Sequence, residues 1–289
     1  MMKLNNPKYT FIETINKCEQ GITGNQILLD KVIAERSSLS SKEQTYKTAA
    51  LTGQLFTIPS LNTATRTNLN VVGSLTKEDL EKLYERYFAK EGKPAREIYD
   101  AIINSAKEQC PYCGGIGTPK NVDHYLPKAH FPQFSVLPLN LVPSCRNCNM
   151  DGKGHAFATI AGDQIIHPYL DKASFFEEQW IFANFHHEPN GEPSYVEYYA
   201  NPPQTWLQDD KDRVNNHFTS FDIAKRYGKQ AAVELSATLK QIENFMNKRF
   251  SAQDIIEVLI APQIESYFCN HWKRVMYQSL ETWLVEQNQ

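Results

Sequence analysis

The sequence of 289 residues predicts an α+β protein that is mostly helical, and three observations support this class. Apolar residues recur at helical spacing over residues 75–105 and again from Asp209 to the C-terminus. Between them lies a segment rich in proline and cysteine, which favours loops and short strands. Aromatic and β-branched residues at 180–185 and 195–199 predict two strands around a turn. The expected regions are a helical N-terminal region (1–105), a core with short strands (106–160), and a C-terminal region with a small β element followed by helices (161–289).

The composition is that of a protein with a hydrophobic core and no general affinity for polyanions. Hydrophobic residues make up 41% of the chain, charged residues 22%, and the net charge is −3. Residues 167–220 contain nine acidic residues and only three basic ones, so this stretch repels phosphate. Any contact with nucleic acid is therefore expected to be local or to depend on a partner. The first six residues lack the apolar region of a secretory signal, and no run is long enough to cross a bilayer, so a cytoplasmic location is expected.

Helix starts are the main signal in the N-terminal region. Residues 37–43 predict a turn followed by a helix with Ser40 or Ser41 as its N-cap, and residues 62–70 predict a loop. Thr76 and Asp79 have the spacing of an acidic capping box at the start of a further helix. A second helix with Ile98, Ile102 and Ile103 on one face leads toward the first cysteines. This pair of helices is expected to form a platform under the core.

The C-terminal region is expected to be helical from Asp209 onward. Its predicted core residues recur at roughly helical spacing. They are Phe221, Ala224, Val233, Leu235, Leu239, Ile242, Phe245 and Met246.

Two CxxC pairs carry four of the six cysteines. Cys110 and Cys113 form the first pair, Cys145 and Cys148 the second, and 31 residues separate the pairs. Two such pairs can complete a tetrahedral four-sulfur shell, which predicts a structural zinc ion that closes a loop too polar to build its own core. The alternatives are free thiols or redox motifs, but a redox CxxC follows a strand and opens a helix in a βαβ unit, which this segment lacks.

Hydrolytic chemistry is indicated by the polar residues between and after the cysteine pairs. His124 is a candidate general base, because its unperturbed pKa lies near neutrality. Asp123 and Asn149 offer oxygen ligands of the kind that Mg²⁺ or Mn²⁺ prefers. Neighbouring residues in a strand point to opposite faces, so Asp123 and His124 can share one site only at a bulge or a strand end. Asn140 is expected to orient His124 through its side-chain amide.

This arrangement resembles the HNH (ββα-metal) nuclease family, in its zinc-stapled branch. The family pattern is an Asp/Glu-His pair, a central Asn, and a final His or Asn on a helix. Asp123-His124, Asn140 and Asn149 match these positions in order, within residues 110–157. Lys153 matches a basic position that often follows in this branch. The resemblance implies a zinc-stapled ββα-metal core.

The resemblance also implies a function. His124 would activate water for phosphodiester hydrolysis, and Mg²⁺ or Mn²⁺ bound to Asp123 and Asn149 would stabilise the developing charge. The substrate would be nucleic acid, with DNA favoured over RNA, and the products would carry 5′-phosphate and 3′-hydroxyl ends. A looser likeness to the HNH subunits of Septu and retron phage-defence systems implies an ATPase or other sensor protein as partner. Candidate phosphate contacts are Lys128, Arg146 and Lys153.

Other interpretations of the same residues remain open. The segment can be a noncatalytic zinc adaptor that docks nucleic acid or a protein. Lys128 and Lys153 can be solvated surface charges. His167 is expected to orient a loop, and His155 to lie at a helix end outside the metal shell.

Overall fold

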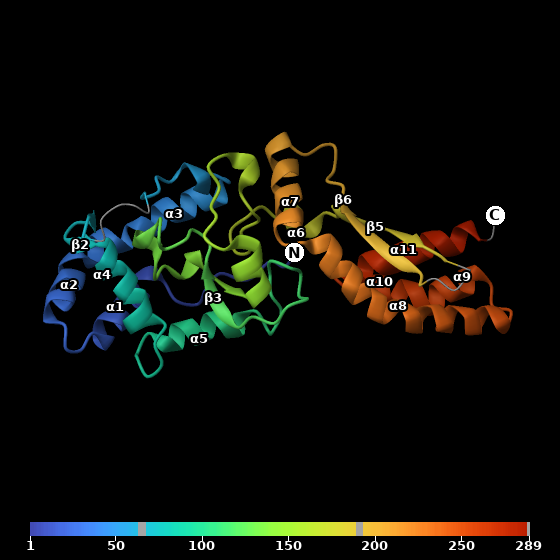
Figure 1. Cartoon of the computed structure of the whole chain (residues 1–289), viewed down its shortest axis with the longest axis horizontal. Coiled ribbons are helices and arrows are strands. Elements are labelled where there is room, and N and C mark those ends of the chain that lie inside the picture. Colours follow the sequence, from blue (N-terminus) through green and yellow to red (C-terminus); the bar gives the residue numbers. More distant parts are fainter. Residues whose placement is uncertain (63–67, 189–192, 288–289) are drawn as a thin grey trace.

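The computed structural model describes residues 1–62, 68–188 and 193–287. Figure 1 shows an elongated molecule. The N-terminal helices lie at one end, the strand β3 lies near the middle of that half, and the long C-terminal helices surround a second pair of strands at the other end. The N-terminus itself returns to the centre of the molecule, where the backbone amide of Met2 bonds the carbonyl of Pro111 at 3.1 Å.

Capped helices build the N-terminal region. Thr10 caps the first helix, and its side chain forms a reciprocal capping box with Glu13. The predicted turn at Ser37 is wrong, because the second helix continues to Ser40. The third helix does begin after Ser41, although the Ser41 side chain makes no capping hydrogen bond. These elements are α1 (Phe11–Gly21), α2 (Gln26–Ser40), α3 (Lys42–Leu51) and the 3₁₀ turn η1 (Leu55–Thr57).

The predicted capping box at Thr76 is confirmed, with Asp79 as its reciprocal partner. The helix that follows changes to π geometry after Lys82. Residues 63–67 of the predicted loop lie outside the described part of the chain, and Asn70 already belongs to a strand. The elements are β1 (Asn70–Val72), β2 (Leu75–Thr76), α4 (Lys77–Lys82), the π-helix η2 (Leu83–Phe88) and α5 (Arg96–Ser105).

A short hairpin and a single helical segment form the core. β3 (Asn121–His124) pairs antiparallel with β4 (Leu141–Ser144), and the π-helix η5 (Asn147–Lys153) follows directly. The connection between the strands contains two 3₁₀ turns, η3 (Pro132–Phe134) and η4 (Pro138–Asn140). Helix α5 packs against both strands, with Ile98 and Ile102 buried, so the predicted helical platform is confirmed.

The C-terminal region places two long helices against a second hairpin. The two predicted strands are confirmed and pair over six residues each, with α8 packed on β6 and α11 packed on β5. Residues 189–192, which include most of the predicted turn, lie outside the described residues. The elements are η6 (Ala161–Asp163), α6 (Ser174–Glu177), β5 (Ile181–His186), β6 (Tyr195–Ala200), α7 (Gln208–Ser220), α8 (Ile223–Asn247), α9 (Ala252–Ile255), η7 (Ile256–Ile260), α10 (Ala261–Glu265) and α11 (Trp272–Glu286).

Two predicted core residues of α8 are exposed. The buried face of this helix runs through Ala231, Leu235 and Ile242. Val233 lies between the first two on the opposite face and is 80% exposed, and Met246 is 40% exposed. Apolar residues alone did not reveal which face of α8 is buried; the packing of the helix against β6 and α11 determines it.

Among the described residues, no helix is both long and apolar enough to cross a membrane.

Candidate metal centre and catalytic site

The hairpin brings the two cysteine pairs together. Cys110 and Cys113 precede β3, and Cys145 follows the last residue of β4, so antiparallel pairing returns the chain to its starting point. The four sulfur atoms lie within 4.8 Å of one another, and all four residues are buried. The predicted four-cysteine cluster is therefore present, and it is the arrangement that a tetrahedral metal requires.

The surroundings of the cluster fit a thiolate-bound metal such as zinc. Backbone amides donate to two of the sulfurs, from Gly117 to Cys113 and from Cys145 to Cys110, both at 3.4 Å. The Arg226 guanidinium of α8 donates to the Cys148 sulfur at 3.1 Å. Sulfur accepts such bonds best as a thiolate, the form in which cysteine binds metal. A side chain at Gly117 would meet the Cys145 sulfur at 2.5 Å, so only glycine allows this close approach.

His124 is the last residue of β3 and is buried, at 8% exposed. Its Nε2 lies 2.8 Å from the carbonyl oxygen of Ser135. Because a carbonyl only accepts, Nε2 carries the hydrogen and Nδ1 keeps a lone pair. The ring packs against Tyr84, with the ring centres 4.4 Å apart. Burial lowers the pKa of His124 to about 3, so the imidazole is neutral at pH 7, with its lone pair on Nδ1, and is a weaker base than a solvated histidine.

Asp123 is a buried carboxylate with one oxygen that makes no hydrogen bond. The side chain belongs to a residue only 6% exposed, and its Oδ2 has no hydrogen-bond donor. The nearest cation is the Lys153 ammonium, 3.6 Å away. Burial raises the pKa of Asp123 to about 6, although Lys153 opposes this shift. A buried acceptor without a donor is costly, and a divalent cation at this oxygen would satisfy it.

The register of the hairpin limits how the Asp123 and His124 side chains can be arranged. The four pairs from Asn121–Ser144 to His124–Leu141 are regular, so the hairpin contains no bulge. His124 instead occupies the strand end, which is the other position that allows both side chains to approach one substrate.

Asn140 braces the loop between the strands rather than the imidazole. Its Oδ1 accepts from the Leu126 amide at 2.7 Å, and its Nδ2 donates to the carbonyls of Leu126 (3.0 Å) and Phe134 (3.1 Å). The expected direct bond from the Asn140 amide to His124 is therefore wrong, because the loop backbone takes every donor. Asn140 positions His124 indirectly, since it fixes Phe134, the residue before Ser135.

A buried chain of hydrogen bonds supports Asn140. The Tyr46 hydroxyl donates to Asn140 Oδ1 at 3.0 Å and lies 3.1 Å from Nε2 of His167. His167 Nδ1 accepts from the amides of Tyr169 and Leu170, which leaves Nε2 as the donor to Tyr46. The expectation that His167 orients a loop is confirmed. Tyr46 and Ser135 were not predicted, and Ser135 acts through its backbone, which no sequence pattern records.

The predicted phosphate contacts lie in different environments. Lys153 is 7% exposed and donates to the His124 carbonyl at 2.6 Å, so its ammonium is already engaged inside the core. Lys128 forms an ion pair with Glu85 at 2.5 Å. Arg146 is exposed just before η5, and Asn149 is partly buried within η5, where its side chain makes no hydrogen bond to the described residues. Their roles as ligands to phosphate or metal stay predictions.

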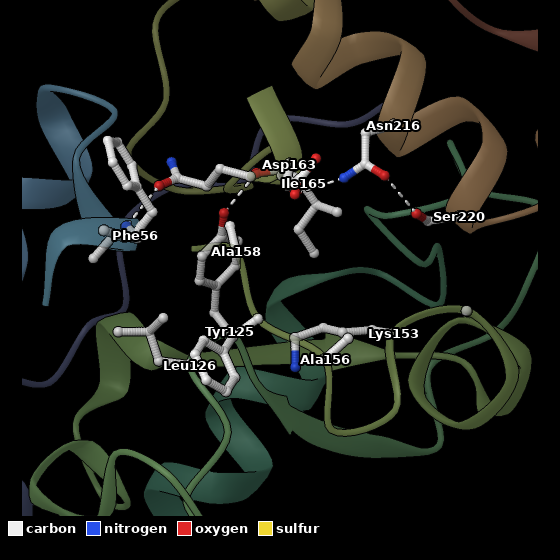
Figure 2. Close-up of a pocket in the computed structure, with 14 residues that line it drawn as sticks. Phe56, Tyr125, Leu126, Lys153, Ala156, Ala158, Asp163, Ile165, Asn216 and Ser220 are labelled. Carbon is white, nitrogen blue, oxygen red and sulfur yellow. Dashed lines mark hydrogen bonds between the residues drawn. The ribbon is translucent and has the colours of Figure 1, made fainter. Parts of the chain in front are cut away.

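A cavity of about 350 Å³ adjoins Lys153. Figure 2 shows Tyr125 and Leu126 on one side, and Asn216 and Ser220 extending from α7 on another. Several of its polar groups bond one another: the Tyr125 hydroxyl binds the Ile165 carbonyl at 2.5 Å, and Ser220 binds Asn216 at 3.0 Å. The Gln164 amide nitrogen, which also belongs to the lining, has no hydrogen-bond partner. One unpaired amide donor does not indicate a particular ligand.

Comparison with known proteins identifies a full-length relative. No protein-family model matches the chain, and no solved structure matches it. The protein ea31 of Escherichia phage lambda is 43% identical over 291 aligned residues, which cover 97% of this chain and 97% of ea31. At this identity and coverage the two chains share one fold and one ancestry. The chain belongs to the family of the phage lambda protein ea31.

Proposed function

We propose that the protein is a metal-dependent HNH-type endonuclease that hydrolyses phosphodiester bonds, with DNA favoured over RNA. One observation supports this function above the others. At the end of a hairpin closed by the four-cysteine cluster, His124 is a neutral imidazole with its lone pair on Nδ1, and the preceding residue, Asp123, is a buried carboxylate whose Oδ2 makes no hydrogen bond and lies 3.6 Å from the Lys153 ammonium. A purely structural Asp-His pair would be expected to satisfy both of these atoms internally.

In the proposed reaction, His124 Nδ1 accepts a proton from water while the water oxygen attacks phosphorus. The bond from phosphorus to the 3′-oxygen breaks on the opposite side, and the 3′-oxygen takes a proton from solvent. This leaves 5′-phosphate and 3′-hydroxyl ends. The Ser135 carbonyl holds the ring and stabilises the imidazolium that forms. Asp123 and Asn149 would hold Mg²⁺ or Mn²⁺, which supplies positive charge at the phosphate in the transition state.

Burial of the pair favours a second candidate, a noncatalytic zinc adaptor. Asp123 and His124 are only 6% and 8% exposed, and the Lys153 ammonium stands beside the carboxylate where a metal would bind. In this alternative, Lys153 and Asp123 form a structural ion pair. The two functions differ in whether the protein binds a divalent cation at Asp123.

Plasmid nicking and metal binding test the proposal together. Zinc-loaded wild-type protein should nick supercoiled plasmid with Mg²⁺ or Mn²⁺. The His124→Ala variant should lose at least about 100-fold in rate, the usual contribution of a general base. Titration with Mn²⁺, followed by electron paramagnetic resonance, should show one site that Asp123→Asn removes.

His187→Ala is the matched control, because this histidine is exposed at the end of the other hairpin. It should nick and bind Mn²⁺ as the wild type does. A wild-type protein that neither nicks plasmid nor binds Mn²⁺ at Asp123 would contradict the nuclease and favour the adaptor.

The proposed biological setting is that of an effector in anti-phage defence, with an ATPase or sensor protein as partner. This part of the proposal depends on the likeness of the sequence to HNH subunits of Septu and retron systems. Copurification of the tagged protein with the products of neighbouring genes would test it.

A further inference from the structure

A basic groove lies between the zinc cluster and α8. Its volume is about 410 Å³. Ten residues line it: Ile116, Gly117, Thr118, Lys120, Cys145, Arg146, Asn147, Arg226, Lys229 and Gln230. Four of the ten are cationic and none is acidic, in a protein whose net charge is −3. The groove therefore departs sharply from the average charge of the molecule.

Arg226 neutralises charge on the cysteine cluster, so it is not one of the cations available to a ligand in the groove. Four thiolates and one Zn²⁺ carry a net charge of −2, and Arg226 contacts the Cys148 and Cys145 sulfurs at 3.1 and 3.7 Å. Its guanidinium is thus used to neutralise the cluster and to attach α8 to it. The remaining three cations are left to act on a ligand.

The three cations Lys120, Arg146 and Lys229 have no side-chain partner among the described residues. Each is exposed, and none forms an ion pair or a side-chain hydrogen bond with the described residues. They come from three separate parts of the chain: the approach to β3, the start of η5, and α8. Their convergence on one groove without a carboxylate is the pattern expected of a site for phosphates.

The groove is joined to the candidate active site through η5. Arg146 directly precedes this helical segment, and Lys153 at its other end contacts Asp123 and the His124 carbonyl. The seven residues of the π-helix η5 span at most about 10 Å, the length that they would have as an α-helix, which corresponds to no more than about three nucleotides along one strand. A nucleic-acid strand held in the groove can therefore reach the Asp123-His124 end of the hairpin.

We propose that this groove binds the sugar-phosphate backbone of the nucleic-acid substrate, through Lys120, Arg146 and Lys229. The proposal rests on the proposed nuclease function for the identity of the strand. It adds that the zinc staple and α8 build the substrate track together, and that Lys128 and Lys153 are not its main contacts. α8 thus acts in substrate binding as well as in folding.

A DNA-binding measurement tests the groove. A His124→Ala parent prevents cleavage, and a labelled 30-base-pair duplex is titrated in Mg²⁺ at several KCl concentrations. The triple variant Lys120→Gln, Arg146→Gln, Lys229→Gln should bind at least about 10-fold more weakly. The slope of log affinity against log salt should become shallower by up to about 2.7, since each phosphate contact contributes about 0.9. Zinc content and circular dichroism establish that the variant is folded.

The matched control changes charge by the same amount away from the groove. Lys240→Gln, Lys248→Gln and Arg249→Gln replace two lysines and one arginine that are exposed at the far end of α8. This control should keep the affinity and salt dependence of the parent. The proposal is overturned if the parent does not bind DNA, if the groove variant binds as the parent does, or if the control loses as much. It is also overturned if the groove retains polyglutamate but not DNA, which would indicate an acidic protein partner.

The failures of the two proposals are distinguishable. If the parent binds DNA through the groove but the wild-type protein neither nicks plasmid nor binds Mn²⁺ at Asp123, the nuclease proposal is wrong and the groove proposal is retained. If the wild-type protein nicks plasmid, the same three substitutions made in the wild-type background leave nicking unchanged, and the triple variant of the His124→Ala parent binds DNA as its parent does, then the groove proposal is wrong and the nuclease proposal is retained.

Discussion

The two hairpins β3–β4 and β5–β6 are both antiparallel pairs, but they are stabilised in different ways. In β3–β4 nearly every residue is buried. The four cysteines lie at its open end, the Asn140 amide holds the connection between the strands, and the Lys153 ammonium bonds the His124 carbonyl at the end of β3. In β6 buried and exposed side chains alternate, and its apolar face packs on α8. The first hairpin is supported by the four-cysteine cluster and buried polar bonds, and the second by apolar burial.

This difference predicts different responses to damage. A buried polar group that loses its partner costs its full desolvation energy, so a network of such groups fails sharply. An apolar contact is one of many, so its loss is graded. A site that must hold a neutral imidazole and a carboxylate in fixed positions benefits from the first kind of support.

Removal of zinc should produce the largest difference in amide protection between the two hairpins. Structural zinc contributes on the order of 10 kcal/mol in small zinc modules, so Cys145→Ser or a chelator should expose the amides of β3, β4 and η5. Amides of β5 and β6 should stay protected. Hydrogen exchange followed by mass spectrometry measures both. Cys269→Ser is the control, because this cysteine lies outside the cluster. Protected β3–β4 amides in zinc-free protein would show that the sulfur cluster does not hold the hairpin.

Asn140→Ala should have the next largest effect. It leaves the Leu126 amide and the carbonyls of Leu126 and Phe134 without their partner, at about 3 kcal/mol or more of unfolding free energy. Urea denaturation measures the change. Asn149→Ala is the control, because the Asn149 side chain has no hydrogen bond to the described residues, and it should cost less than about 0.5 kcal/mol. A cost below about 1 kcal/mol for Asn140→Ala would mean that the loop finds other partners.

Acid should destabilise the region around the first hairpin. Burial lowers the pKa of His167 and His217 to about 3, so between pH 6.5 and 3 the unfolded chain binds more protons than the folded one. Stability should fall as pH falls through that window, by up to about 1.4 kcal/mol per pH unit for each histidine. His124 contributes to the pH dependence of stability in the same direction, because its pKa is also lowered. Asp123 contributes in the opposite direction, because its pKa is raised in the folded protein. Below pH 6 it therefore offsets part of the loss of folding stability.

Urea unfolding at pH 7, 6 and 5 measures this slope. The His167→Gln variant should show a smaller change of unfolding free energy per pH unit, because the contribution of His167 is removed. An unchanged slope in His167→Gln would show that His167 is charged in the folded state or already neutral in the unfolded one.

The smallest effect is expected in the second hairpin. Tyr198→Phe removes a bond from the Tyr198 hydroxyl to the Trp272 carbonyl, 2.9 Å long, and should cost about 1 kcal/mol. Its neighbour Tyr199 is 38% exposed, so Tyr199→Phe should change stability by less than about 0.5 kcal/mol. Thermal denaturation compares them. A loss from Tyr198→Phe as large as that from Asn140→Ala would remove the contrast between the hairpins.

Local patterns were predictable from the sequence. The Thr76 capping box and the two C-terminal strands follow from residue types within a few positions. The four-cysteine cluster was predictable because metal geometry constrains CxxC spacing directly. The helical phase of α8 was not, because apolar residues lie on both of its faces, and Val233 is exposed.

The sequence by itself determined which residues can ligate zinc and which residue types can perform hydrolytic chemistry, since both depend on the atoms that a side chain carries. Only the tertiary structure decided where those atoms point. It assigned the Ser135 carbonyl to His124, the Asn140 amide to the loop backbone, and Arg226 to cysteines about 80 residues earlier in the chain. Such pairings join positions that are distant in sequence, and packing of the whole chain selects them.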